Sequence, residues 1–128
     1  MTKILVVEDD KNQRKLYEQE LSDEGYQVST APGGREALAE IEKNRPDLVL
    51  MDISMPGMDG IEALGKILGV DNTIPVILNT AYANYKDNFL SWAADAYVVK
   101  SSDLAELKKT IKEVLERRRE DGAGGARR

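Results

Sequence analysis

The chain contains no cysteine and no histidine among its 128 residues. Without thiols it can form neither a disulfide framework nor a thiolate metal site. Without imidazoles it has no histidine base, no histidine metal ligand and no phosphohistidine. Any chemistry must therefore use carboxylates, hydroxyls, lysine and bound ions.

Long apolar runs are missing as well. No run approaches the ~20 residues needed to cross a bilayer, and the N-terminus has no signal-peptide pattern. We therefore expect a cytoplasmic protein without a membrane span. The balance of 41% hydrophobic and 32% charged residues is that of a globular protein, and the length suits one domain with one core.

The charge is unevenly distributed along the chain. The formal net charge is -5, but residues 117–128 hold five basic and two acidic side chains, which leaves -8 for the rest. An acidic body argues against direct nucleic-acid binding. The end of the chain is rich in glycine and alanine, as flexible segments are. We predict one folded domain over residues 1–118 and a flexible basic tail over 119–128.

Short apolar runs alternate with longer helical patterns. Buried strands are predicted over 4–7, 48–51, 75–78 and 96–99, and a strand with one solvated face over 26–30. Helices are predicted over 11–24, 33–44, 60–68 and 83–93, with a last helix that begins after a cap at Ser102 or Asp103.

This alternation is typical of an α/β domain whose parallel sheet is covered on both faces. We expect a flavodoxin-like, five-stranded parallel sheet in the order 2-1-3-4-5, with five flanking helices. The polar strand over 26–30 suits an edge of that sheet.

Polar side chains follow four of the predicted strands. Glu8 and Asp9 follow the first strand, Asp52 the third, Thr80 the fourth and Lys100 the fifth. In an open parallel sheet the carboxyl ends of the strands meet at one edge, where ligands bind. We therefore expect three carboxylates, one hydroxyl and one ammonium to converge on one pocket.

One acidic residue after a strand is ordinarily a solvated turn or a helix cap. Three carboxylates together are different, because two such charges ~4 Å apart repel by roughly 4 kcal/mol at an effective dielectric of about 20. A bound cation would neutralise them, and a set of oxygen ligands favours Mg²⁺ or Mn²⁺. The ammonium suits a site that also receives an anion.

Four motifs at these positions resemble a known family. They are Ile4-Leu5-Val6-Val7-Glu8-Asp9-Asp10, Pro46-Asp47-Leu48-Val49-Leu50-Met51-Asp52, Met55-Pro56-Gly57-Met58-Asp59-Gly60 and Tyr97-Val98-Val99-Lys100. Together they resemble the receiver domain of two-component response regulators, of the single-domain, chemotaxis-regulator type. The resemblance covers about residues 2–117.

The resemblance implies a role for each polar residue of the pocket. Asp52 would be the phosphoacceptor. It would bind Mg²⁺ together with Asp9 as a direct ligand, Glu8 acting more through water, and the backbone carbonyl of Ser54. Asp10, one place beyond the acidic pair, is expected to be the N-cap of the first helix.

The resemblance also implies a switch. Lys100 would pair with the phosphoryl group, and Thr80 would move inward to donate its hydroxyl to it. Tyr97 would then turn from an exposed to a buried rotamer. The face built from helix four, strand five and helix five would change with it.

Some positions depart from the family pattern or vary within it. Ser101 and Ser102 follow Lys100 where the family usually has a proline, so we expect a trans peptide bond after Lys100. Ser54 and Tyr82 occupy variable positions that control access to the phosphoryl site. An aromatic stripe on the fourth helix serves either the core or a surface for an output partner: Tyr85, Phe89 and Trp92.

The implied partners are a histidine kinase or histidine phosphotransfer protein as donor and an unknown output protein. We expect a switch rather than an enzyme, acting as a monomer or weak dimer. One alternative is a Mg²⁺-dependent phosphohydrolase with an Asp nucleophile. Such enzymes commonly need a second Asp where this chain has Ser54. Another alternative is a degenerate receiver that acts only as an interaction module.

Overall fold

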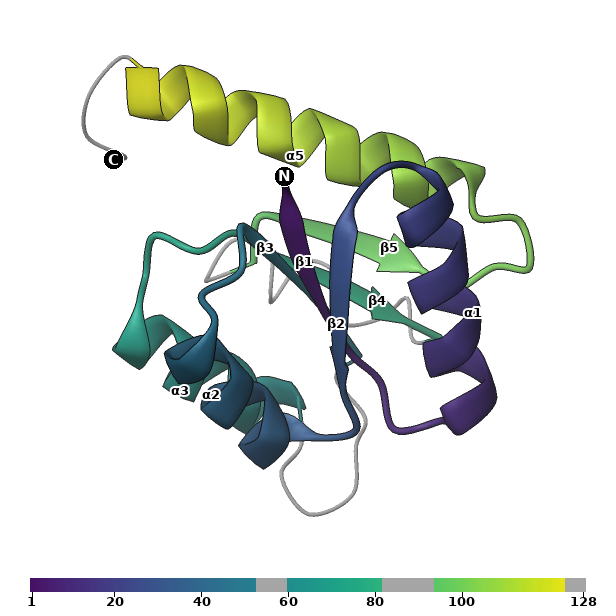
Figure 1. Cartoon of the computed structure of the whole chain (residues 1–128), viewed down its shortest axis with the longest axis horizontal. Helices are drawn as coiled ribbons and strands as arrows, with labels where there is room; N and C mark the ends of the chain where they lie inside the picture. The colour runs from purple at the N-terminus through teal and green to yellow at the C-terminus, as the bar shows by residue number, and fades with distance from the viewer. Residues whose placement is uncertain (53–59, 82–93, 124–128) are drawn as a thin grey trace.

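A computed structural model describes residues 1–52, 60–81 and 94–123. Within these ranges the strands form a five-stranded parallel sheet in the predicted order, β2-β1-β3-β4-β5. The strands are β1 (Lys3–Val7), β2 (Gln27–Ala31), β3 (Leu48–Met51), β4 (Val76–Thr80) and β5 (Ala96–Val99). The helices are α1 (Lys11–Asp23), α2 (Gly34–Lys43), α3 (Gly60–Val70) and α5 (Ala105–Ala123) (Figure 1).

Most element boundaries agree with the sequence patterns to within one or two residues. The strands over 48–51 and 96–99 are confirmed as predicted, and the polar strand lies at an edge of the sheet. β4 continues two residues beyond its predicted end, so Thr80 is its last residue and does not lie just past the strand. The predicted helix over 83–93 lies outside the described residues.

Helices cover both faces of the sheet (Figure 1). α1 and α5 pack on one face, and α2 and α3 pack on the other. The alternation of side chains along each strand divides the core accordingly. In β1, for example, Ile4 and Val6 face α1 and α5, whereas Leu5 and Val7 face α2 and α3.

α1 begins and ends at residues suited to those positions. The side chain of Asp10 accepts hydrogen bonds from the backbone N–H groups of Asn12 (2.9 Å) and Gln13 (3.1 Å), so its predicted role as N-cap is confirmed. After the helix, Gly25 has a φ of 97°. Glycine adopts this left-handed conformation without the steric cost of a Cβ atom, so the chain can turn into β2.

α5 is capped at its start and anchored near its other end. The Asp103 carboxylate accepts a bond from Ala105 N (3.0 Å), as one of the two predicted caps. Arg118 donates to both oxygens of Asp95 (2.9 and 3.1 Å) and to the carbonyl of Thr73 (2.7 Å). These bonds fasten α5 to the segments that lead into β4 and β5.

The helix continues past residue 118, where we expect the domain to end. Residues 119–123 have helical backbone, and residues 124–128 lie outside the described ranges. The flexible tail therefore stays a prediction for residues beyond Ala123. In the part of the chain that the structure describes, no helix has both the length and the apolar character needed to cross a membrane.

Candidate functional site

The predicted site residues converge because of strand alternation. Val6 in β1, Leu50 in β3 and Val98 in β5 all face the core under α1 and α5. Side chains two residues further along a strand direction lie on the same face. Those positions are just past the carboxyl ends of the three strands, and they are occupied by Glu8, Asp52 and Lys100.

Lys100 joins the two carboxylates. Its Nζ donates to Glu8 Oε1 at 2.7 Å and to Asp52 Oδ2 at 2.8 Å. The side chains of Glu8, Asp52 and Lys100 are only 3%, 9% and 16% exposed, so water screens these charges weakly. The ammonium therefore offsets much of the repulsion between the two carboxylates.

Asp9 brings a third carboxylate to the same place. One carboxylate oxygen each from Glu8, Asp9 and Asp52 can be chosen so that all three lie within 4.8 Å of one another, and Asp9 is exposed. Three carboxylates against one ammonium leave a net negative charge. Clustered oxygen ligands with an open side fit a hard divalent cation such as Mg²⁺, which keeps several waters of its own.

Burial strengthens this preference for a cation. Burial raises the pKa of the Glu8 carboxyl; hydrogen bonds from Lys100 and Asp10 N oppose the increase, and the charge of Asp52 adds to it. Burial lowers the pKa of Lys100, but its hydrogen bonds to Asp52 and Glu8 outweigh this effect and the net pKa is raised. Lys100 is therefore charged at neutral pH, while Glu8 gains from a further positive charge.

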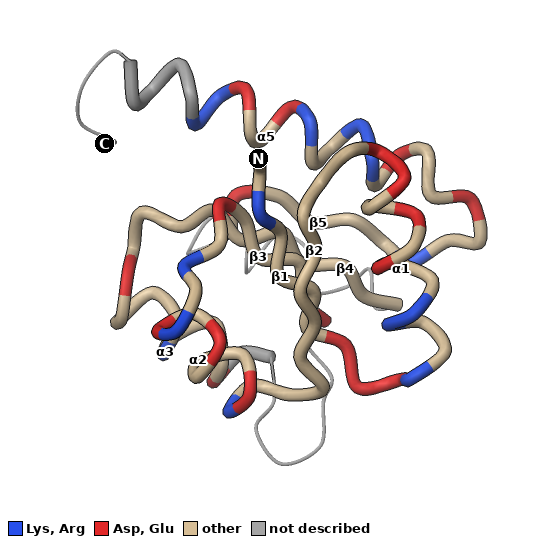
Figure 2. The backbone as a smooth tube through the Cα atoms, viewed as in Figure 1, with Lys and Arg blue, Asp and Glu red and all other residues tan. Residues whose placement is uncertain are grey.

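The turn between β1 and α1 holds the acidic pair in place. It is acidic along its length in Figure 2, and its three residues are Glu8, Asp9 and Asp10. The backbone N–H of Asp10 donates to Glu8 Oε2 at 3.1 Å. Arg14, one turn into α1, donates to the carbonyls of Glu8 (2.8 Å) and Asp9 (3.4 Å). The helix start and the acidic pair thus form one rigid unit.

Two further polar residues belong to this site and were not predicted from the sequence. Asn79 in β4 and Tyr17 in α1 line a small crevice together with Glu8 and Asp52. Tyr17 and Asn79 are 4% and 3% exposed, and the Tyr17 hydroxyl donates to Gln13 Oε1 at 3.5 Å. Burial raises the pKa of Tyr17, whereas the neighbouring Asn79 side chain and the charge of Lys100 oppose the increase.

Thr80 and Tyr97 lie in β4 and β5, the strands beside the site, and both are buried. Thr80 ends β4 with a fully buried side chain, and its carbonyl accepts a bond from Lys100 N at 2.7 Å. Tyr97 in β5 is 8% exposed and packs in the core beneath α2 and α3. The predicted roles of both in a switch remain predictions.

Several predicted residues lie in ranges that the structure does not describe. Ser54, Tyr82 and the aromatic stripe fall within residues 53–59 and 82–93. The peptide bond between Lys100 and Ser101, which the structure does describe, is trans as expected.

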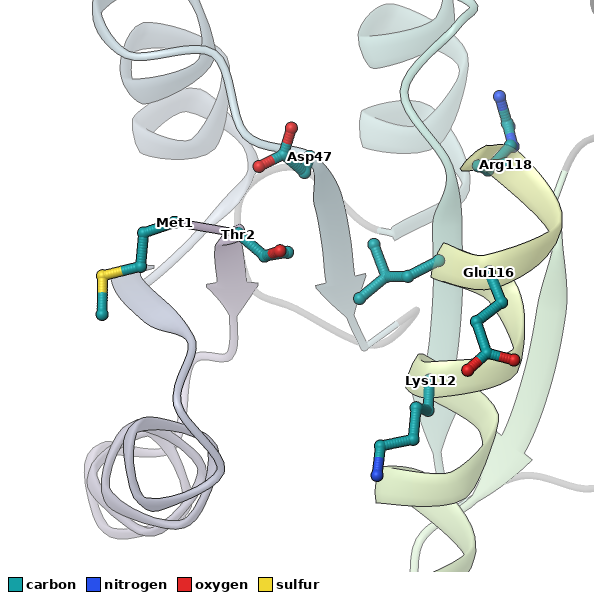
Figure 3. Close-up of a pocket in the computed structure, with 7 residues that line it drawn as sticks. Met1, Thr2, Asp47, Lys112, Glu116 and Arg118 are labelled. Carbon is teal, nitrogen blue, oxygen red and sulfur yellow. The ribbon is translucent and has the colours of Figure 1, made fainter. Parts of the chain in front are cut away.

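A larger hollow lies at the amino ends of the strands, near the chain start and α5 (Figure 3). Its charged lining residues are Asp47, Lys112, Glu116 and Arg118. Charges of both signs alternate there, and Asp47 Oδ2 already accepts a bond from Lys3 N at 2.8 Å. The hollow therefore lacks a cluster of three carboxylates like the one at Asp52.

Comparison with known proteins agrees with this site. The profile of the response regulator receiver domain matches residues 4–112. The transcriptional regulatory protein PrrA of Mycobacterium tuberculosis is 38% identical over 118 residues, which are 91% of this chain and 51% of PrrA. Sporulation initiation phosphotransferase F of Bacillus subtilis is 38% identical over 115 residues, which are 88% of this chain and 93% of that protein. The chain thus spans about half the length of PrrA.

Solved structures give the same result. The response regulator TrrA of Thermotoga maritima, in complex with Mg²⁺-BeF, has a TM-score of 0.84 and 46% identity, with 89% of this chain and 99% of that chain covered. TrrA in complex with the histidine kinase ThkA has a TM-score of 0.83 and 46% identity, with 90% and 99% covered. This chain therefore belongs to the response regulator receiver domain family, the phosphoacceptor switches of two-component signalling systems.

Proposed function

We propose that Asp52 is the residue of this receiver that accepts the phosphoryl group. The observation that carries the proposal is the hydrogen bond of 2.8 Å from Lys100 Nζ to the Asp52 carboxylate, inside a cluster of three carboxylates. In the transfer, a carboxylate oxygen of Asp52 forms the new O–P bond while the P–N bond of a donor phosphohistidine breaks. The electron pair of that bond stays with the leaving imidazole.

We propose that Asp9 and Asp52 hold a divalent cation, Mg²⁺ or Mn²⁺, with the backbone carbonyl of Ser54. Glu8 would act more through water, because its two oxygens already accept bonds from Lys100 and Asp10 N. When bound, the cation offsets negative charge that develops on the phosphoryl oxygens. The net negative charge of the cluster supports this assignment.

Lys100 is the residue poised to receive the phosphoryl oxygens. It already lies at hydrogen-bond distance from Asp52, so a short movement of its ammonium brings it to a phosphoryl group on that carboxylate. Phosphoryl transfer depends mainly on positioning and on charge stabilisation of this kind. The new acyl phosphate adds roughly -1.5 to -2 charge and three strong acceptors.

Those acceptors would drive the switch. Thr80 is fully buried in this structure, so its hydroxyl would reach the phosphoryl oxygens through a movement of the end of β4. Tyr97, three residues before Lys100 in the sequence, would respond through β5, whose end is bonded to Thr80 O by Lys100 N. The face of helix four, β5 and α5 would then change its fit to an output protein.

The partners follow from this role. The donor would be a histidine kinase or a histidine phosphotransfer protein in the cytoplasm, and the output partner another protein. We propose a monomer or weak dimer that acts as a switch and not as an enzyme with turnover. Ser54 and Tyr82 would govern how readily water reaches the phosphoryl group.

The test is phosphorylation by acetyl phosphate, followed by intact mass. With Mg²⁺ the chain should gain one phosphoryl group, and with EDTA none. The Asp52→Asn variant keeps the size of the side chain and should gain none. Equal labelling of Asp52→Asn would refute the assignment. Steady release of phosphate without a labelled protein would indicate a phosphohydrolase instead.

A further inference from the structure

The crevice next to Asp52 has two polar lining residues, Tyr17 and Asn79, that have no role in the function proposed so far. Tyr17 and Asn79 lie in the core under α1 and α5, where their neighbours are aliphatic side chains such as Val6, Leu50 and Ile77. Burying a hydroxyl or an amide costs free energy unless each finds a hydrogen-bond partner. Apolar residues of similar size would fill the same space without this requirement.

The two side chains lie on the wall of one crevice. The Tyr17 hydroxyl donates to Gln13 Oε1 at 3.5 Å, and the Asn79 side chain acts to lower the pKa of the phenol. In the described part of the chain, every buried side-chain nitrogen and oxygen has a hydrogen-bond partner. The pair thus places two buried polar groups between α1 and β4, next to Asp52.

Strand order places this pair beside the path of Lys100. β4 lies between β3, which leads to Asp52, and β5, which leads to Lys100. Asn79 follows Leu78, the partner of Met51, and therefore lies next to Asp52 across the two strands. To reach Asp52 and Glu8, the Lys100 side chain must cross β4 at the level of Asn79.

Tyr17 closes the same space from the helix side. It lines the crevice with Glu8, Asp52 and Asn79, and its phenol oxygen lies within the electrostatic reach of Lys100. A polar wall next to an ammonium limits where that ammonium can go, because fixed dipoles favour particular positions of the charge.

We propose that Tyr17 and Asn79 are positioning residues for phosphoryl transfer, which hold the Lys100 ammonium over the Asp52 carboxylate. This inference rests on the proposed role of Asp52 and Lys100. The pair acts through Lys100 and does not itself contact the phosphoryl group. Preorganisation of this kind raises the rate of transfer, because small misplacements of a reacting group are costly.

The variants that test the proposal keep the packing and remove the polar groups. Tyr17→Phe removes only the hydroxyl, and Asn79→Leu replaces the amide with an aliphatic side chain. At saturating Mg²⁺, each should slow labelling by acetyl phosphate about tenfold, as expected when a reacting group is slightly misplaced. Tyr26→Phe is the matched control, because Tyr26 packs on the same core just before β2, at the far edge of the sheet. Its labelling rate should not change.

A double-mutant cycle with Lys100→Met distinguishes a positioning role of the pair from a merely structural role. If the pair acts through Lys100, Tyr17→Phe should cause no further slowing in the Lys100→Met protein, and the affinity for beryllofluoride should follow the same pattern. An unchanged rate in Tyr17→Phe would overturn the inference. So would the same fold-loss in both backgrounds, or a loss that only follows a smaller folded fraction by circular dichroism.

The controls also separate this inference from the proposed function. If the unaltered chain took up no phosphoryl group at all, the role of Asp52 would fail and the inference would fail with it. Normal labelling of the unaltered chain with unaffected variants would refute the inference alone.

Discussion

Replacing Lys100 with methionine removes the ammonium while it keeps most of the aliphatic side chain. Glu8 and Asp52 then remain as buried carboxylates, in a cluster whose oxygens lie within 4.8 Å of one another. Two such charges repel by roughly 3 kcal/mol at an effective dielectric of about 20. Removing one partner of a buried ion pair typically costs about 3–5 kcal/mol. We expect Lys100→Met to lower the free energy of unfolding in metal-free buffer by about 3–5 kcal/mol.

The same variant should bind Mg²⁺ more tightly than the unaltered chain. The ammonium no longer competes with the cation for Glu8 and Asp52, and the net negative charge of the cluster grows by one. Because a ligand that binds only the folded state stabilises it, Mg²⁺ should restore much of the lost stability. The variant should nevertheless be phosphorylated more slowly, since the phosphoryl oxygens lose their cationic partner.

Urea unfolding followed by circular dichroism, in EDTA and in Mg²⁺, measures both effects. The double variant Glu8→Gln/Lys100→Met is the control, because it removes one of the two repelling carboxylate charges and should recover part of the stability in EDTA. Equal unfolding free energies of Lys100→Met and the unaltered chain in EDTA, together with equal Mg²⁺ affinities, would refute this electrostatic account.

Three other predictions follow from the same structure. Asp9→Ala should weaken Mg²⁺ binding more than Glu8→Ala, because both oxygens of Glu8 are already hydrogen-bonded. A calorimetric titration in which Glu8→Ala weakened binding more would contradict the assigned roles. The pKa of Asp71 is lowered to about 2, first by its hydrogen bond from a threonine hydroxyl, so its contribution to stability is present above the ordinary pKa of 3.8 and is lost as the pH falls through about 2. Acid unfolding of Asp71→Asn should therefore show a weaker pH dependence in that range, and identical acid profiles would refute this. Arg118→Met should destabilise the fold by about 3 kcal/mol, because the largely buried Asp95 carboxylate loses its ion pair with the Arg118 guanidinium; an unchanged urea midpoint would contradict this.

The sequence was sufficient to predict the sheet and the acidic part of the site. The strands that lead to Glu8 and Asp52 contain runs of Ile, Val, Leu or Met that are buried on both faces, residues 4–7 and 48–51, and such runs are a strong local signal. Once the strands are parallel, their carboxyl ends must meet, so Glu8, Asp52 and Lys100 converge without any knowledge of long-range contacts.

The polar wall of the site could not be recognised in the same way. Tyr17 precedes Leu21 by four residues, which is the spacing of an ordinary core face on a helix. Asn79 follows the apolar run of β4, and the predicted end of that strand at residue 78 excluded it. Its alternation with Ile77 was the one available signal, since it places the amide on the same face as Asp52.

The ion pair that anchors α5, between Arg118 and Asp95, could not be predicted from the sequence for a different reason. Arg118 and Asp95 are separated by 23 residues, and neither belongs to a motif. Their pairing depends on how α5 crosses the amino ends of the strands, which local patterns do not determine.

Thr80 was placed just past β4 because threonine at the end of a strand is equally compatible with the strand and with a loop.

The central claim is that Asp52 carries the phosphoryl group, and chemical trapping tests it most directly. After labelling with acetyl phosphate and Mg²⁺, borohydride reduces an aspartyl phosphate to homoserine, and peptide mass spectrometry identifies the converted residue. We predict homoserine at position 52 alone, and none when EDTA replaces Mg²⁺. Conversion at Asp9 or at any other carboxylate, with Asp52 unmodified, would contradict the account.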